Sequence, residues 1–225
     1  MAEKPAYPPL RIDGTVYGVA LNNRNEIACL ATSFAAAPYK EPPQAPVLYV
    51  KPLNTHLAHG GVVSIPAEIP EIEPAAAIAI IFDRDTSRVS EADAMSHVAG
   101  YTLALDLSRP TDSYYRPPIV EKCRDGFLPI GPWLVPAGDI GDPLSLSVSL
   151  EVDSVAMGDL CLRDLARPVW RLIADISDFM TFRRGDVLLT GLTPPGARAR
   201  VGSSISAVAT GLGRLDCTIA LEKSV

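Results

Sequence analysis

The sequence predicts a β-rich α+β domain, and three observations carry that prediction. Residues 144–152 have leucine or valine at every even position and serine or glutamate at every odd one, which is typical of a strand with one buried face. The 21 prolines cluster between short apolar runs, which favours short strands and loops over long helices. The sequence also lacks the regular strand–helix alternation of a doubly wound sheet.

Other apolar runs predict further strands. The segment Leu215–Leu221 alternates like residues 144–152 and follows a turn predicted at Gly211–Gly213. Runs with little polar content, as in strands buried on both faces, occupy residues 47–50, 75–82, 101–105 and 187–190.

Two helices are predicted. The first covers Ser90–Gly100, because the Ser90 hydroxyl can accept a hydrogen bond from the Asp93 amide and Gly100 can end the helix. The second covers Leu165–Met180, where apolar residues as far as Phe179 recur at helical spacing. Pro168 is compatible with this helix because it falls in the first turn.

The bulk composition indicates one globular domain. The chain has 225 residues, of which 48% are hydrophobic and 20% charged, so we expect a single domain over residues 1–225, with residues 1–15 as an N-terminal extension. The net charge of −6 argues against nucleic acid as a partner. There is no apolar run of the roughly 20 residues that a membrane span needs and no apolar signal core at the start, so we expect a cytoplasmic protein.

The segment Gly100–Trp133 has the composition of a functional site. It combines Asp106, Lys122 and an Arg-Asp-Gly turn at Arg124 with an otherwise apolar run rich in glycine and proline. A hydrophobic core requires none of these charges, so they suggest a site.

Three segments resemble the fumarylacetoacetate hydrolase family. Tyr49–Thr55 is similar to its Y-x-K-P-x-x-T loop, Val89–Asp106 to a segment ending in a metal-binding aspartate, and Phe179–Gly191 to its F-M-T-L-x-P-G-D-x-I-x-T-G segment. The resemblance implies a roll of mixed β-sheets with a few short helices, which agrees with the α+β prediction.

Other segments narrow the resemblance to one subgroup. Val19–Arg24, Ala37–Pro43, Ser113–Pro117 and Lys122–Phe127 resemble the N-terminal half, or separate small subunit, of isomerase/decarboxylases of 4-hydroxyphenylacetate (homoprotocatechuate) degradation. The resemblance implies action on 2-hydroxyhepta-2,4-dienedioate and 5-oxopent-3-ene-1,2,5-tricarboxylate, which are small dicarboxylate and tricarboxylate keto or enol acids. It also implies a homodimer or a heteromer with a paralogous subunit.

The metal site that the resemblance implies departs from the family pattern. Family members hold Mg²⁺ or a similar cation with two glutamates and one aspartate, and alignment on residues 80–82 places Ala75 and Ala77 at the glutamate positions. Asp106 is then the one remaining ligand. Glu71 and Glu73 form a second Glu-x-Glu four residues earlier, which stays open as an alternative ligand pair. We therefore expect no tightly bound cofactor, and Mg²⁺ or Mn²⁺ only if the family site is retained.

The candidate catalytic residues are Asp106, Lys122 and Glu26. Asp106 is a candidate base, because burial would raise its pKa, and Lys122 can stabilise a dienolate. Glu26 stands where family hydrolases have a histidine and is an alternative base. Residues with donors suited to substrate carboxylate or enolate oxygens are Arg116, Arg124, Tyr115 and Thr193.

Three functions remain open at this point. The first is an isomerase, a tautomerase of 2-hydroxyhepta-2,4-dienedioate within an isomerase/decarboxylase, because proton transfer needs no hydrolytic water. The second is a non-catalytic partner of a metal-competent paralogue. The third is a metal-dependent acylpyruvate-type hydrolase that uses Glu71, Glu73 and Asp106.

Overall fold

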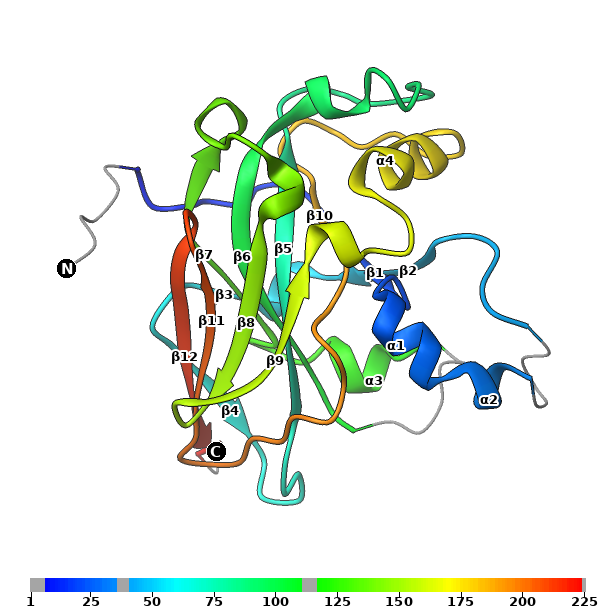
Figure 1. Cartoon of the computed structure of the whole chain (residues 1–225). Coiled ribbons are helices and arrows are strands. Elements are labelled where there is room, and N and C mark those ends of the chain that lie inside the picture. Colours follow the sequence, from blue (N-terminus) through cyan, green and yellow to red (C-terminus); the bar gives the residue numbers. More distant parts are fainter. Residues whose placement is uncertain (1–6, 36–40, 111–116, 224–225) are drawn as a thin grey trace.

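The strands form two sheets in the computed structural model, which describes residues 7–35, 41–110 and 117–223 (Figure 1). The first sheet has seven strands in the order β2-β1-β10-β5-β6-β7-β3, and the second has five in the order β4-β12-β11-β8-β9. The strands of the first sheet are β1 (Val16–Ala20), β2 (Val47–Lys51), β3 (His56–Leu57), β5 (Glu73–Phe82), β6 (Val98–Ser108), β7 (Leu128–Pro136) and β10 (Val187–Leu189). Those of the second are β4 (Gly61–Ile65), β8 (Ser147–Val152), β9 (Val155–Cys161), β11 (Ser204–Ala209) and β12 (Gly213–Leu221).

The two sheets are mixed and enclose the main hydrophobic core. Most strand pairs are antiparallel, but β1 pairs with β10, β3 with β7, and β4 with β12 in parallel. One face of the first sheet, including Ile78 and Leu105, packs with Leu150 and Ile205 of the second in one buried cluster. A second, smaller cluster lies on the other face of β5 and β6 and includes Ala77 and Ala104. Because β5 and β6 are buried on both faces, their sequences are almost continuously apolar.

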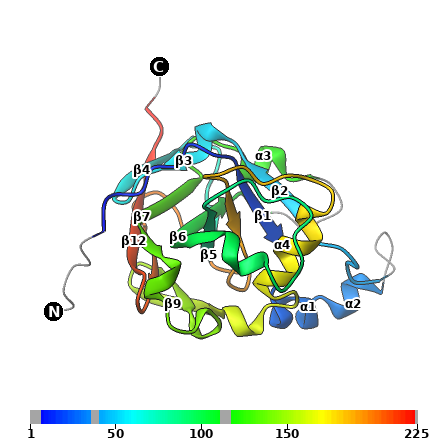
Figure 2. The same cartoon turned by 90° about the horizontal axis from the view of Figure 1, so that it is seen from above.

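The helices are short and lie outside the sheets. They are α1 (Arg24–Cys29), α2 (Ala31–Phe34), α3 (Ile119–Lys122) and α4 (Val169–Ser177), with 3-10 turns at Leu53–Thr55, Ala94–His97, Ala137–Asp139, Pro143–Ser145 and Leu162–Asp164. Seen from above, α1, α2 and α4 lie on the side opposite β7 and β12 (Figure 2). In the ranges that the structure describes, no helix is long and apolar enough to cross a bilayer.

The α+β prediction is confirmed, and the predicted strands are present with shifted ends. Residues 75–82 and 101–105 lie within the longer β5 and β6. The alternating strand begins at Ser147 rather than Leu144, because Pro143–Ser145 form a 3-10 turn capped by the Asp142 side chain. Leu146, Val148, Leu150 and Val152 are buried, as the alternation predicts.

The prediction of a helix over Ser90–Gly100 is wrong. The Ser90 hydroxyl does accept a hydrogen bond from the Asp93 amide, but only a 3-10 turn at Ala94–His97 follows and β6 begins at Val98. Gly100 lies inside β6, where a Cβ atom would collide with the backbone carbonyl of Val135 in β7. This glycine therefore permits close strand packing and does not end a helix.

The second predicted helix is too long at both ends. Pro168 is the residue that precedes the first turn, so α4 begins at Val169, and Leu165 pairs instead with Asn23 in an isolated bridge. The helix ends at Ser177, which leaves Phe179 67% exposed rather than on the buried face. The buried face consists of Val169, Leu172, Ile173, Ile176 and Ser177.

Candidate functional site

Asp106 is the centre of a buried polar cluster near the end of β6. It is 1% exposed and lies directly opposite Ala75 of β5. Because side chains alternate along a strand, Leu105 and Leu107 enter the main core while Asp106 lies on the opposite face with Ala104. A buried carboxylate is costly unless it is paired, so its partners define the cluster.

Tyr49 of β2 reaches this carboxylate because the neighbouring strand has no side chain in its way. Gly18 of β1 is paired with Tyr49, and a Cβ atom at Gly18 would overlap the tyrosine ring. The Tyr49 hydroxyl donates a hydrogen bond to Asp106 Oδ2 at 2.7 Å. A glycine in β1 thus lets a residue of β2 join the site.

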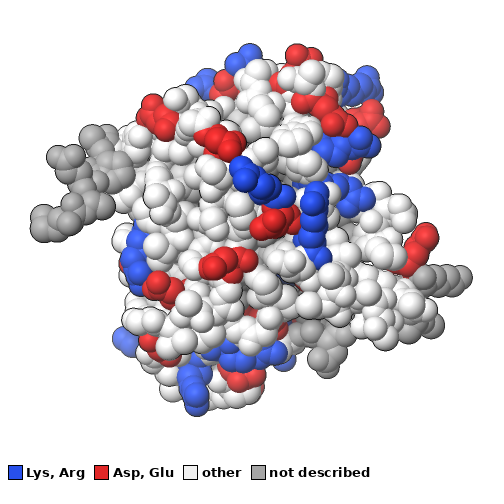
Figure 3. Space-filling model, in the orientation of Figure 1, with Lys and Arg blue, Asp and Glu red and all other residues white. Residues whose placement is uncertain are grey.

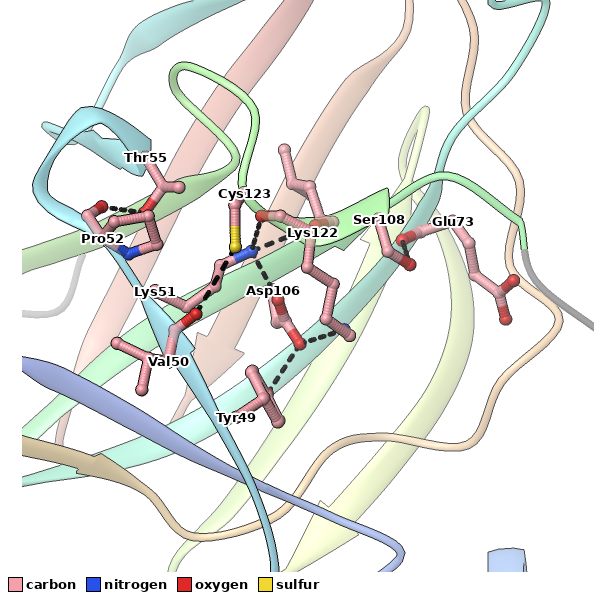
Figure 4. Close-up of polar contacts among 11 residues, drawn as sticks. Tyr49, Val50, Lys51, Pro52, Thr55, Glu73, Asp106, Ser108, Lys122 and Cys123 are labelled. Atoms are coloured by element: carbon pink, nitrogen blue, oxygen red, sulfur yellow. Dashed lines mark hydrogen bonds and ion pairs between the residues drawn. The ribbon is translucent and has the colours of Figure 1, made fainter. Parts of the chain in front are cut away.

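Two lysines complete the cluster, one on each carboxylate oxygen (Figure 4). Lys51, the last residue of β2, places Nζ 2.7 Å from Asp106 Oδ1, and Lys122, the last residue of α3, places Nζ 2.5 Å from Oδ2. The Lys122 ammonium also lies 4.9 Å from the centroid of the Tyr49 ring. We call Tyr49, Lys51, Asp106 and Lys122 the lysine–aspartate cluster.

The charges in this cluster reverse one expectation. Burial alone would raise the pKa of Asp106, but the ammonium groups of Lys122 and Lys51 outweigh burial and hold this pKa well below its ordinary value. The expectation of a raised pKa is therefore wrong, because it did not include two buried cations from β2 and α3. A carboxylate with such a low pKa is a weak base at neutral pH.

Tyr49 and Lys51 keep their protons near neutral pH. Burial and then the charge of Asp106 raise the pKa of Tyr49 well above its ordinary value, so its phenol remains a neutral donor. Burial lowers the pKa of Lys51 to about 8, although the attraction of Asp106 opposes this shift. Lys51 is therefore mostly protonated at pH 7.

Glu26 is a nearly buried carboxylate outside the cluster. It lies in α1, a helix whose first turn is capped by the Asn23 side chain, and is 7% exposed. Its charge is the smallest of four causes that raise the pKa of Tyr49. The structure thus brings two predicted residues, Asp106 and Lys122, into direct contact, and Glu26 acts on the same cluster through its charge.

The four predicted substrate-binding residues have different positions. Arg124 is half-buried in the turn after α3, and its carbonyl accepts a hydrogen bond from Phe127. Thr193 is buried beside β5, where its hydroxyl accepts a hydrogen bond from the Ala76 amide. Tyr115 and Arg116 lie outside the described residues. The substrate-binding role of all four stays a prediction.

Glu71 and Glu73 face an arginine and not Asp106. Arg198 Nε lies 3.1 Å from Glu71 Oε1, and Arg198 Nη1 lies 3.2 Å from Glu73 Oε2. Glu73 is paired in register with Ser108, two residues beyond Asp106. Both glutamates are therefore engaged in ion pairs with Arg198 in this structure.

The residues around Asp106 do not fit a divalent cation. Ala75 is directly opposite Asp106, and Ala77 is on the same face two residues further along, opposite Ala104, so neither supplies an oxygen ligand. Both Asp106 oxygens already contact ammonium groups. Among the residues described by the structure, no group of three or more His, Cys, Asp or Glu side chains is arranged to hold a metal ion.

Sequence reasoning did not assign Tyr49 and Lys51 to the site, although it noted the segment that contains them. The signal available was a lysine at the end of the otherwise apolar run VLYVK, since a lysine that ends a buried strand needs a counter-charge. The identity of that counter-charge, 55 residues further along the chain, follows only from the fold.

Two surface hollows lie away from the lysine–aspartate cluster. They have volumes of about 410 and 500 Å³, lie between residues 43–46 and α4, and are not lined by any member of the cluster. On the face shown in Figure 3, acidic and basic side chains are interspersed. The candidate site rests instead on the buried charges around Asp106.

The mixed-sheet fold and the sequence over most of the chain define a family of proteins. The family model for the fumarylacetoacetate (FAA) hydrolase C-terminal region matches residues 15–220. The chain therefore belongs to the fumarylacetoacetate hydrolase family.

Among the relatives is the 4-hydroxyphenylacetate degradation bifunctional isomerase/decarboxylase of Escherichia coli. It is 32% identical over 212 residues, which are 94% of this chain and 48% of the relative. This chain thus spans about half the length of that relative.

Two solved structures share the fold. The 5-carboxymethyl-2-hydroxymuconate delta-isomerase of Mycobacterium smegmatis has a TM-score of 0.78 at 25% identity, covering 97% of this chain and 82% of that one. The fumarylpyruvate hydrolase of Pseudomonas aeruginosa, in complex with Mn²⁺ and pyruvate, has a TM-score of 0.79 at 26% identity, covering 97% and 98%. The relatives are thus enzymes of the family, including isomerases and a metal-containing hydrolase.

Proposed function

We propose that this chain is a tautomerase that converts 2-hydroxyhepta-2,4-dienedioate into its keto form, as the isomerase part of an isomerase/decarboxylase. The observation that carries the proposal is the pair of lysines on Asp106, with alanine at the two positions where the family pattern has metal-binding glutamates. The similarity to the Escherichia coli isomerase/decarboxylase of 4-hydroxyphenylacetate degradation supports the choice of substrate.

The reaction needs proton transfer and stabilisation of negative charge. The enol oxygen loses its proton, the two double bonds each shift by one position, and carbon 5 gains a proton. The Lys122 ammonium can stabilise the negative charge that develops on the oxygen, and such interactions are strong in a water-poor site. No hydrolytic water is consumed.

Glu26 is the group we assign to proton transfer, and Asp106 is assigned to holding the two lysines. This division follows from the charges, because the lysines keep the pKa of Asp106 low and a weak base transfers protons poorly. Glu26 is nearly buried and its charge acts on Tyr49, which is the basis for assigning it to the same substrate.

The donor set favours tautomerisation over decarboxylation or hydrolysis. In both of those reactions, a divalent cation is the natural means of stabilising the developing enolate, and the residues around Asp106 do not fit one. We further propose that the chain acts with a second family domain, since it spans 48% of the Escherichia coli relative.

The purified chain is expected to accelerate loss of the dienol ultraviolet absorbance of 2-hydroxyhepta-2,4-dienedioate in the presence of EDTA. Glu26→Gln is expected to lower kcat by roughly 10²- to 10⁴-fold, the usual contribution of a general acid–base group. Glu68→Gln makes the same chemical change at an exposed position and should leave kcat unchanged.

Other outcomes would replace this function. No acceleration over spontaneous ketonisation would favour a non-catalytic partner subunit. Activity that appears only with Mg²⁺ or Mn²⁺ and disappears in Glu73→Ala would favour the metal-dependent hydrolase. Full activity in Glu26→Gln would contradict the role of Glu26 alone.

A further inference from the structure

We infer that Lys51 is a positioning residue: its buried ammonium holds Asp106 and the end of α3 so that Lys122 presents free N–H groups to an anionic oxygen of the ligand. The inference rests on the proposed function only for the identity of that ligand, a keto or enol diacid. Lys51 has no part in the proton transfer proposed above.

Lys51 connects three parts of the fold through one nitrogen atom. Its Nζ lies 2.7 Å from Asp106 Oδ1 and donates hydrogen bonds to the carbonyl oxygens of Leu107, at 3.1 Å, and Lys122, at 2.8 Å. An ammonium has three N–H groups. Two of them donate to these carbonyl oxygens, whereas Asp106 Oδ1 is held as an ion pair and has no hydrogen-bond donor among the described residues. The Lys51 side chain is 0% exposed, and it therefore cannot itself contact a ligand.

Lys122 differs from Lys51 in both respects. Within the described part of the chain, its Nζ has one hydrogen-bond acceptor, Asp106 Oδ2 at 2.5 Å. Its side chain is 13% exposed, and two of its three N–H groups have no acceptor among the described residues. We assign these two groups to the ligand. Lys51 acts on Lys122 from both ends, because it contacts the Lys122 carbonyl and the carboxylate that holds the Lys122 ammonium.

The charge of the cluster favours an anion. Among its four residues, the two ammonium groups exceed the single Asp106 carboxylate by one positive charge, and Tyr49 stays neutral because its pKa is raised. The charge of Glu26 acts on Tyr49 from outside the cluster and opposes this excess. Ala75 and Ala77 add no negative charge on this face of the sheet, whereas glutamates at both positions would make the cluster negative unless a metal ion were present. The Lys122 ammonium can therefore attract a carboxylate or enolate oxygen.

A double-mutant cycle tests whether Lys51 acts through Lys122. On 2-hydroxyhepta-2,4-dienedioate, we expect Lys122→Met to lower kcat/KM by roughly 10²- to 10³-fold, as for loss of one charge-stabilising donor. Lys51→Met should lower it about 10- to 100-fold, as for loss of an orienting partner. The double variant should match Lys122→Met within a factor of about two, because the effects are not additive. Lys223→Met, at an exposed lysine, is the charge-matched control.

The cycle has one outcome that overturns the inference. If the two losses multiply in the double variant, Lys51 supports the fold independently of Lys122 and has no positioning role. Thermal unfolding of each variant shows whether it is folded at the assay temperature.

A binding measurement separates this inference from the proposed function. Calorimetry with the saturated analogue 2-oxoheptanedioate should show binding to the wild-type chain that is weakened in Lys51→Met and in Lys122→Met, without additivity. If this result holds while the wild type lacks tautomerase activity, the positioning role stands and the proposed function is wrong. No binding to the wild type, or unchanged binding to Lys51→Met, would overturn the positioning role.

Wild-type protein provides a test that does not depend on a variant that folds. Reductive methylation followed by mass spectrometry should modify Lys122, leave Lys51 unmodified, and modify Lys122 more slowly when 2-oxoheptanedioate is present. Modification of Lys51 at the rate of Lys122, or no protection of Lys122, would contradict the assigned geometry.

Discussion

Asp106→Leu is expected to lower the free energy of unfolding by about 3–5 kcal/mol, the usual cost of leaving one partner of a buried ion pair uncompensated. The variant would keep the fully buried Lys51 ammonium without its counter-charge and would remove the acceptor for Lys122. Urea denaturation followed by circular dichroism measures the loss.

Asp106→Leu should lower the free energy of unfolding much less when Lys51 is also replaced by an apolar residue. In a Lys51→Met background, the leucine has no buried ammonium to leave unpaired, and well-packed apolar pairs often replace buried ion pairs at little cost. Asp178→Leu, at an exposed aspartate, should change stability by at most about 0.5 kcal/mol. An equal loss for Asp106→Leu in both backgrounds would contradict the assigned ion pair.

At acid pH, the wild type should lose its higher free energy of unfolding relative to Asp106→Leu. The folded-state pKa of Asp106 is lowered, so it lies below the unfolded value of about 3.9. The unfolded chain therefore binds the proton more readily, and the stability due to this carboxylate is present above about pH 5 and lost as the pH falls through the folded-state pKa. A difference between the two proteins that grows on acidification would contradict the lowered pKa.

Ala75→Glu combined with Ala77→Glu is expected to create a Mn²⁺ site. The register of β5 and β6 places position 75 opposite Asp106 and position 77 on the same face, roughly 7 Å further along the strand. Three carboxylates are a ligand set that suits Mg²⁺ and Mn²⁺. Paramagnetic resonance of free Mn²⁺ should detect binding at least about tenfold tighter than in the wild type, that is, about 1.4 kcal/mol.

Stability should then depend on the metal. In EDTA, the two new buried carboxylates are expected to lower the free energy of unfolding by several kcal/mol, and Mn²⁺ should restore part of it, because a ligand that binds the folded state stabilises it. Adding Asp106→Asn to the same variant removes the third ligand and should abolish the stabilisation by Mn²⁺. Equal Mn²⁺ binding by wild type and variant, or a wild-type site lost in Glu71→Ala, would show that the metal ligands lie elsewhere.

Local patterns were sufficient to predict much of the fold. The alternation in residues 146–152 matches the buried face of β8, and the apolar runs at 75–82 and 101–105 lie within β5 and β6. The first predicted helix was wrong because a cap residue and a glycine are compatible with more than one structure. The packing of Gly100 against β7 selected the strand.

The amino-acid sequence by itself determined the β-rich class, the family, and the alanines at positions 75 and 77, because these depend on the type and order of residues. The tertiary structure decided which groups surround Asp106. Tyr49, Lys51 and Lys122 meet Asp106 from β2 and α3, and Gly18 allows the approach. The pKa of Asp106 is low and not high because burial and two cations act on it together, and their sum exists only when distant segments of the chain are packed around one carboxylate.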